Sequence, residues 1–106
     1  MPTRTAQQYS EIAKRLVALY DEPFGGKERG RFRISMKLVR TLFGARRVWP
    51  EEMEALRRAL YEEGYILIDL ESYCVVVSLQ TFANYRRVND SSVAAVDTGP
   101  ANGSPQ

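Results

Sequence analysis

The 106-residue chain carries 15 Lys and Arg against 13 Asp and Glu and no His. Its length and its 44% hydrophobic content predict one domain with a modest core. This composition excludes a wholly disordered protein. No apolar run reaches the roughly 18 residues that a membrane-spanning helix needs, and residues 1–10 lack the apolar region of a secretory signal. The single cysteine, Cys74, fits a reducing compartment, so we expect a cytoplasmic protein.

The first periodic stretch predicts a helix over residues 5–20. Thr5 and Gln8 have the spacing of a capping box, which would satisfy unpaired amides at the helix start. Pro23 and the glycines after it would end the helix. Apolar residues recur at three- and four-residue steps, as one buried helical face requires: Tyr9, Ile12, Ala13, Leu16, Val17 and Tyr20.

A short strand and a second helix are predicted next. Residues 31–34 alternate charged and apolar side chains, which is typical of a half-buried strand. Ser35 is suited to cap a helix over residues 36–43. Gly44 stands where a helix commonly ends through a left-handed residue.

A basic link leads into a third predicted helix over residues 50–63. Pro50 fits its first turn, where the missing N–H costs nothing, and we expect Trp49 to pack against Met53 at its entrance. Gly64 would close the helix. The inner stripe is Met53, Leu56 and Leu60.

Two runs rich in β-branched and aromatic residues, 65–70 and 73–79, predict an antiparallel hairpin. Tyr65 and Tyr73 are expected to pair across it. A short last helix over about 80–87 would follow. We therefore expect one ordered domain over residues 5–88, and a disordered tail over 89–106, whose small polar residues offer almost nothing bulky to bury.

This order of elements resembles the winged helix-turn-helix superfamily, which many small bacterial transcription regulators use. The resemblance implies an α+β, winged-helix-like fold, with three helices, a short strand and a C-terminal hairpin, followed by a short helix. It also implies that helix 50–63 enters the DNA major groove and that the hairpin tip, about residues 70–73, touches the DNA as a wing. The helix nevertheless opens with Glu51, Glu52 and Glu54, which would repel phosphates.

The first 50 residues hold 11 Lys and Arg against 4 Asp and Glu, whereas residues 51–90 hold 4 against 8. A basic patch supplies most of the affinity in nucleic-acid binding, because neutralised phosphates release counterions. We therefore expect a double-stranded DNA-binding protein, a transcription regulator or accessory factor, with Arg57 and Arg58 as the base readers. The residues expected to contact the DNA backbone are Arg31, Arg33, Lys37, Arg40, Arg46 and Arg47.

The alternative is a protein-interaction or dimerisation module that uses the same fold without nucleic acid. Basic residues on one face together with Arg57 or Arg58 would favour DNA, whereas scattered ones paired with Glu would favour a protein partner. A homodimer through the first or last helix is expected in either case.

An enzyme is not expected. The chain lacks His, the usual general base and metal ligand. Cys74 lies in an apolar predicted strand, so we expect it to be a buried, unreactive side chain. No Gly-rich phosphate loop is present. We therefore predict no catalytic residue, no cofactor and no metal site.

Overall fold

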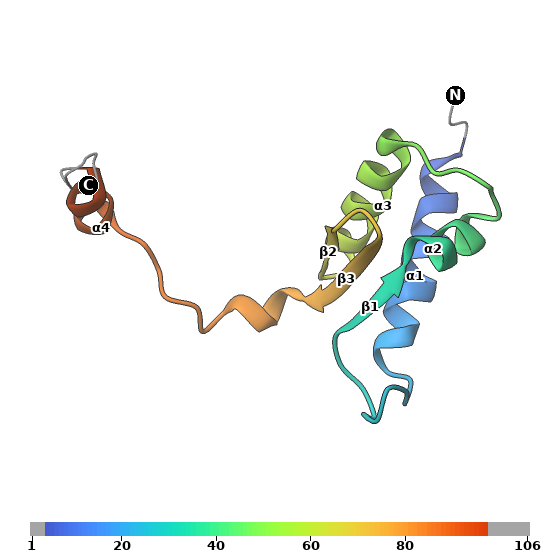
Figure 1. Ribbon diagram of the computed structural model, residues 1–106, viewed down its shortest axis with the longest axis horizontal. Coiled ribbons are helices and arrows are strands. Elements are labelled where there is room, and N and C mark those ends of the chain that lie inside the picture. The colour runs from blue at the N-terminus through green and yellow to red at the C-terminus, as the bar shows by residue number, and fades with distance from the viewer. Residues whose placement is uncertain (1–3, 98–106) are drawn as a thin grey trace.

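The computed structural model describes residues 4–97. Within them lie four α-helices and one three-stranded antiparallel sheet, which makes an α+β fold (Figure 1). No helix in this range is both long and apolar enough to cross a membrane. The elements in chain order are α1 (Ala6–Tyr20), β1 (Phe32–Ser35), α2 (Met36–Phe43), α3 (Pro50–Glu62), β2 (Tyr65–Asp69), β3 (Tyr73–Ser78), the 3-10 turn η1 (Leu79–Phe82) and α4 (Asp90–Asp97).

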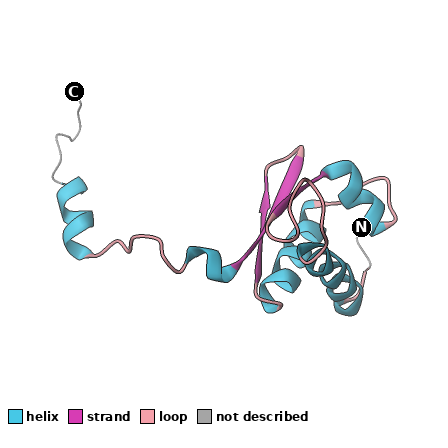
Figure 2. Ribbon diagram, turned by 90° about the horizontal axis from the view of Figure 1, so that it is seen from below, coloured by secondary structure: helices cyan, strands magenta, loops and turns pink. Residues whose placement is uncertain are grey.

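The sheet has the strand order β1-β3-β2, so β3 is central and β1 lies at an edge. Phe32 and Leu67 both pair with Val76, one from each side. Helices α1, α2 and α3 lie on one side of the sheet (Figure 2). Because successive strand residues point to opposite faces, Phe32 and Ile34 are buried beneath the helices while Arg33 stays exposed.

The core forms where α1 and α3 pack together over the sheet. Leu16 of α1, Leu56 and Leu60 of α3 and Val76 of β3 are fully buried. Tyr20 joins the end of α1 to the hairpin, because its ring lies 5.0 Å from that of Tyr65, and its hydroxyl accepts a hydrogen bond from the backbone.

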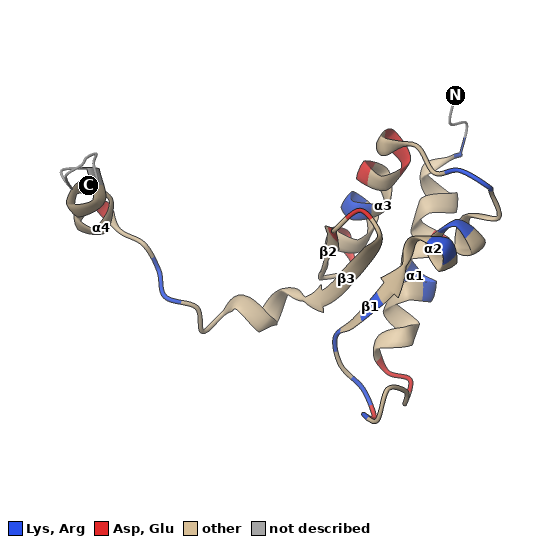
Figure 3. Cartoon of the chain, viewed as in Figure 1, with Lys and Arg blue, Asp and Glu red and all other residues tan. Residues whose placement is uncertain are grey.

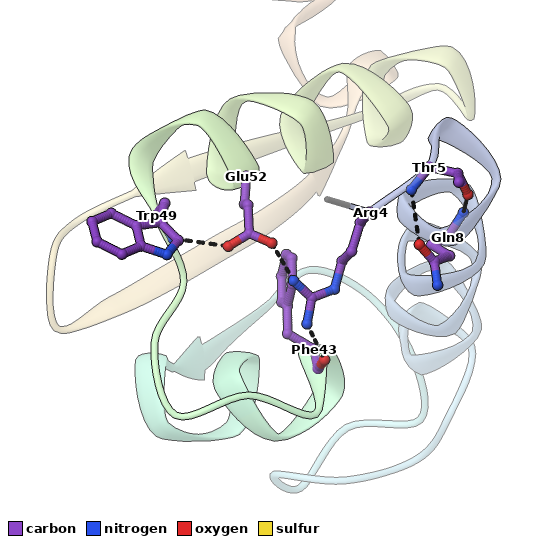
Figure 4. Close-up of polar contacts among 6 residues, drawn as sticks. All are labelled: Arg4, Thr5, Gln8, Phe43, Trp49 and Glu52. Carbon is purple, nitrogen blue, oxygen red and sulfur yellow. Dashed lines mark hydrogen bonds and ion pairs between the residues drawn. The ribbon is translucent and has the colours of Figure 1, made fainter. Parts of the chain in front are cut away.

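The helix ends follow local chemistry, as the sequence predicts. The Thr5 hydroxyl accepts from the Gln8 amide at 3.2 Å, and the Gln8 side chain accepts from the Thr5 amide at 2.8 Å (Figure 4). The Ser35 hydroxyl caps α2 through the amide of Leu38 at 3.2 Å. Gly44 ends α2 in the left-handed region at φ 66°, which glycine adopts without steric cost.

A junction of Arg4, Phe43, Trp49 and Glu52 ties the start of the chain to α2 and α3 (Figure 4). The Arg4 guanidinium pairs with the Glu52 carboxylate, donates to the Phe43 carbonyl at 2.6 Å and lies 5.0 Å from the Phe43 ring centroid. Glu52 is only 1% exposed, and its other oxygen accepts from the Trp49 amide at 3.1 Å. We refer to these four residues as the Arg4 junction.

The hairpin forms as predicted, but the expected Tyr65–Tyr73 pair is wrong. Tyr65 is opposite Ser78, and Tyr73 is opposite Ser35 of β1, so the two tyrosines lie at opposite ends of the hairpin. The turn between the strands contains Glu71 at φ 75°, a left-handed conformation that side chains other than glycine rarely adopt.

The C-terminal segment also differs from the prediction. The helix expected over 80–87 is a 3-10 turn that ends at Phe82, and residues 83–89 are exposed, so no packing supports a longer helix. In the segment expected to be disordered, residues 90–97 form the helix α4, and the Asn89 side chain accepts from the Ser92 amide at 2.9 Å at its start. Residues 98–106 of that predicted tail lie outside the described residues.

Candidate nucleic-acid interface

Six of the predicted contact residues come from β1, α2 and the segments beside them. Arg33 follows the buried Phe32 in β1 and projects from the outer face of the strand, and Arg31 is exposed directly before the strand. Lys37 and Arg40 are three residues apart on α2, which places them on one helical face. We call the full set the β1–α2 surface: Arg31, Arg33, Lys37, Arg40, Arg46 and Arg47.

The cations of the β1–α2 surface are not neutralised. Within residues 4–97, ion pairs involve Arg4, Arg29, Arg57 and Arg58, and none of the six. Five of the six side chains are exposed, and Arg40 is half-buried. The surface therefore keeps its full positive charge.

Two aromatic rings support guanidinium groups of this surface. The Arg33 guanidinium lies 5.7 Å from the ring centroid of Tyr73, and that of Arg47 lies 4.0 Å from the ring of Trp49. Trp49, which we expected to pack against Met53, is 37% exposed. A cation over an aromatic face is attracted by the ring quadrupole, so both side chains are held in place while their N–H groups remain able to donate.

The outer face of α3 is different, because its arginines are already paired. Arg57 donates to both oxygens of Glu54, through Nε at 3.0 Å and through Nη2, and Arg58 Nε donates at 3.3 Å. The hydrogen bond from Arg57 lowers the pKa of Glu54 below its usual value, and the same bond raises the pKa of Arg57. Both predicted base readers thus share one carboxylate.

The two basic groups differ in their wider surroundings as well. Lys and Arg positions follow β1, α2 and the loop after α2, whereas Asp and Glu gather at the start of α3 and at the β2–β3 turn (Figure 3). Of the three glutamates at the start of α3, Glu51 and Glu54 face solvent, but Glu52 is held inside the Arg4 junction. Because Glu54 is paired with Arg57 and Arg58, the expected repulsion at this helix start comes chiefly from Glu51.

The α1–β1 loop extends the basic region. A hollow of about 390 Å³ is lined by Lys27, Arg29, Arg31 and Arg33, with Glu22 as its one carboxylate. Arg29 pairs with Asp21 at 2.5 Å, which raises the pKa of the arginine. Lys27 is exposed and forms no ion pair with another residue in the range 4–97, so it joins the interface. It belongs to the same basic run of the sequence as the six residues, but it was not among those predicted to contact DNA.

The one cysteine is chemically quiet. Cys74 is fully buried, and its sulfur lies 3.6 Å from that of Met36. Burial, and secondarily the charge of Asp69, raises the pKa of the thiol to about 11. Since the thiolate is the nucleophilic form, Cys74 is not an activated nucleophile.

No family model, curated protein or solved structure matches this chain. The function of the interface is therefore inferred from the charges, contacts and exposure of its own residues.

Proposed function

We propose that this protein binds double-stranded DNA, chiefly through phosphate contacts from the β1–α2 surface. The observation that carries the proposal is the group of six cations without a carboxylate partner in the described chain. Such a group releases condensed counterions from DNA when it neutralises phosphates, which supplies sequence-independent affinity.

The element order supports a winged-helix-like reading of the fold. Three helices, a strand between the first two, and a hairpin after the third follow one another as in that superfamily, and β1 joins the hairpin to complete the sheet. In that family α3 would lie in the major groove.

The charges favour an approach led by α2 instead. Glu51 on α3, and Asp69 and Glu71 at the hairpin turn, are exposed and would face phosphates in the usual docking mode. Arg57 and Arg58 are held by Glu54, so reading of base edges by α3 requires those ion pairs to open. We therefore favour an accessory factor with weak sequence preference over a site-specific regulator.

A fluorescence-anisotropy titration with random-sequence duplex tests the proposal. Binding should weaken steeply between about 50 and 200 mM salt. Replacing Arg46 and Arg47 together by Ala should flatten the salt slope by nearly two units and lower affinity by about fiftyfold near 0.1 M salt, because each phosphate contact contributes about 0.9 units.

The matched control removes two charges from α3. Changing Arg57 and Arg58 to Ala should affect random duplex much less, since Glu54 already neutralises part of their charge. No binding by the unmodified protein at low salt, or equal losses in the two double variants, would contradict the proposal.

A further inference from the structure

An apolar groove of about 560 Å³ runs along the outer edge of β1. All four residues of the strand line it, together with Leu19, Phe24, Leu38 and Tyr73 among others. Because neighbouring strand residues point to opposite faces, a groove that meets four in a row follows the backbone edge. The opposite edge of β1 is already hydrogen-bonded to β3.

The wall of this groove is unusually apolar for a surface. Leu38 of α2 is 53% exposed and Phe24 is 45% exposed. Phe24 is held in position, because its ring lies 5.9 Å from that of Phe32 and its backbone closes a turn with Lys27. Neither side chain belongs to the buried core, so both are available to contact a partner.

The groove carries positive charge only. Arg33 is the one charged residue among those that line it, and no carboxylate lines it. The adjoining basic hollow shares Phe24, Phe32 and Arg33 with the groove and adds Lys27 and Arg31. The groove therefore combines an apolar wall on the core side with cations on the outer side.

We propose that this groove receives an extended acidic segment of a partner protein, which adds to the sheet as a strand beside β1. Edge strands bind peptides in this way, with main-chain hydrogen bonds for affinity and alternate side-chain positions for specificity. Residues of one parity would place apolar side chains against Leu38 and Phe24. Residues of the other parity would place carboxylates near Arg33.

A second copy of the chain fits the groove poorly. In the antiparallel register that places Phe32 of one copy opposite Ile34 of the other, Arg33 of one copy lies opposite Arg33 of the other. Like charges directly opposite in a sheet are destabilising. The same arginine attracts an acidic strand. The positive charge of Arg33 therefore favours an acidic partner and disfavours a second copy of this chain.

The test uses a fluorescein-labelled octapeptide in which Glu alternates with Val or Ile, and the full-length protein. The control peptide has Lys at every Glu position. Saturable binding of the acidic peptide and not of the basic one is expected. Arg33→Glu should weaken acidic-peptide binding by about tenfold, and Leu38→Ser by a similar factor.

Lys14→Glu is the matched control variant, because Lys14 is an exposed cation of α1 that does not line the groove. It should change affinity by less than about twofold. Both groove variants replace exposed side chains, so thermal unfolding should show that they fold. Hydrogen exchange should show new protection of β1 amides when the acidic peptide is bound.

Three results would overturn the inference. The first is no saturable binding, or equal weakening by Lys14→Glu and Arg33→Glu, which would mean unspecific charge attraction. The second is a dimer in sedimentation that Leu38→Ser dissolves, because a second copy would then fill the groove. The third is loss of duplex binding in Leu38→Ser without any peptide binding, which would assign this groove to nucleic acid. Duplex binding that persists while peptide binding fails leaves the proposed function standing.

Discussion

The β1–α2 surface and the outer face of α3 carry the same kind of side chain in opposite electrostatic surroundings. Lys37 and Arg46 have no carboxylate partner in the described chain, whereas Arg57 and Arg58 converge on Glu54. The field that a DNA strand meets depends on the net charge around each cation. The difference teaches that a count of arginines on a surface predicts binding only after their partners are known.

The largest expected effect is a loss of thermal stability when the Arg4 junction, which connects α2 to α3, is broken. Arg4→Met removes the guanidinium that links the end of α2 to the start of α3 and leaves the Glu52 carboxylate buried without its ion pair. A buried charge that loses its partner costs about 3 kcal/mol. The thermal midpoint should fall by roughly 10–20 °C.

Two variants control for that result. Arg29→Met breaks the exposed pair with Asp21 and should leave the midpoint nearly unchanged. The double variant Arg4→Met, Glu52→Leu replaces both partners with apolar groups and should recover part of the loss. A midpoint that stays the same in Arg4→Met would show that the junction does not stabilise the fold.

A smaller gain in stability is expected at the hairpin turn. Glu71→Gly relieves the left-handed backbone strain at φ 75°, which should outweigh the added chain entropy by about 0.5–1 kcal/mol. Urea denaturation measures the gain, and Ser72→Gly should give none. If this turn approaches DNA in the way a wing does, Glu71→Gly also tightens duplex binding, and if only the β1–α2 surface makes contact, affinity stays constant.

A variant without the Glu54 carboxylate tests whether the ion pairs on α3 weaken DNA binding by that helix. Glu54→Gln removes the shared carboxylate, so the positive charges of Arg57 and Arg58 are no longer offset by a negative one. Random-duplex affinity should rise about two- to fivefold if α3 lies within a Debye length of the DNA, and the rise should shrink with salt. Glu62→Gln, an exposed acid near the other end of α3, is the control. Unchanged affinity in Glu54→Gln would place α3 away from the DNA.

The smallest effect is expected from the C-terminal segment. Residues 90–96 are exposed, and α4 lies apart from the rest of the described chain (Figure 1). Truncation after Asp90 should therefore keep both the thermal midpoint and the duplex affinity. A drop of more than about 5 °C, roughly 1 kcal/mol for a domain of this size, would mean that the segment stabilises the domain.

Local chemistry in the sequence predicts most of the fold. The Thr5–Gln8 capping box, the Ser35 cap and the left-handed Gly44 each depend on neighbours within a few residues, and all three are confirmed. The helix predicted over 80–87 was wrong, because the chain forms a 3-10 turn that ends at Phe82 and its next residues are exposed and not helical.

The candidate site was less accessible from the sequence. Arg4 and Glu52 are 48 residues apart, so no local pattern reveals their pair. By contrast, the pairing of Glu54 with Arg57 and Arg58 follows from spacings of three and four along a helix, and that signal was missed. The groove beside β1 depends on contacts among α1, α2 and the sheet, which only the folded chain brings together.

The Arg4 junction has a consequence for proteolysis. Trypsin cleaves on the carboxyl side of arginine, and it must draw the guanidinium into its own specificity pocket. The Arg4 side chain is occupied by Glu52 and the Phe43 carbonyl, so cleavage there has to wait until these contacts open. When opening and closing are fast, the rate of such a cut reports the equilibrium population of the open form. The rate at which the first four residues are released would thus report how often the Arg4 junction opens.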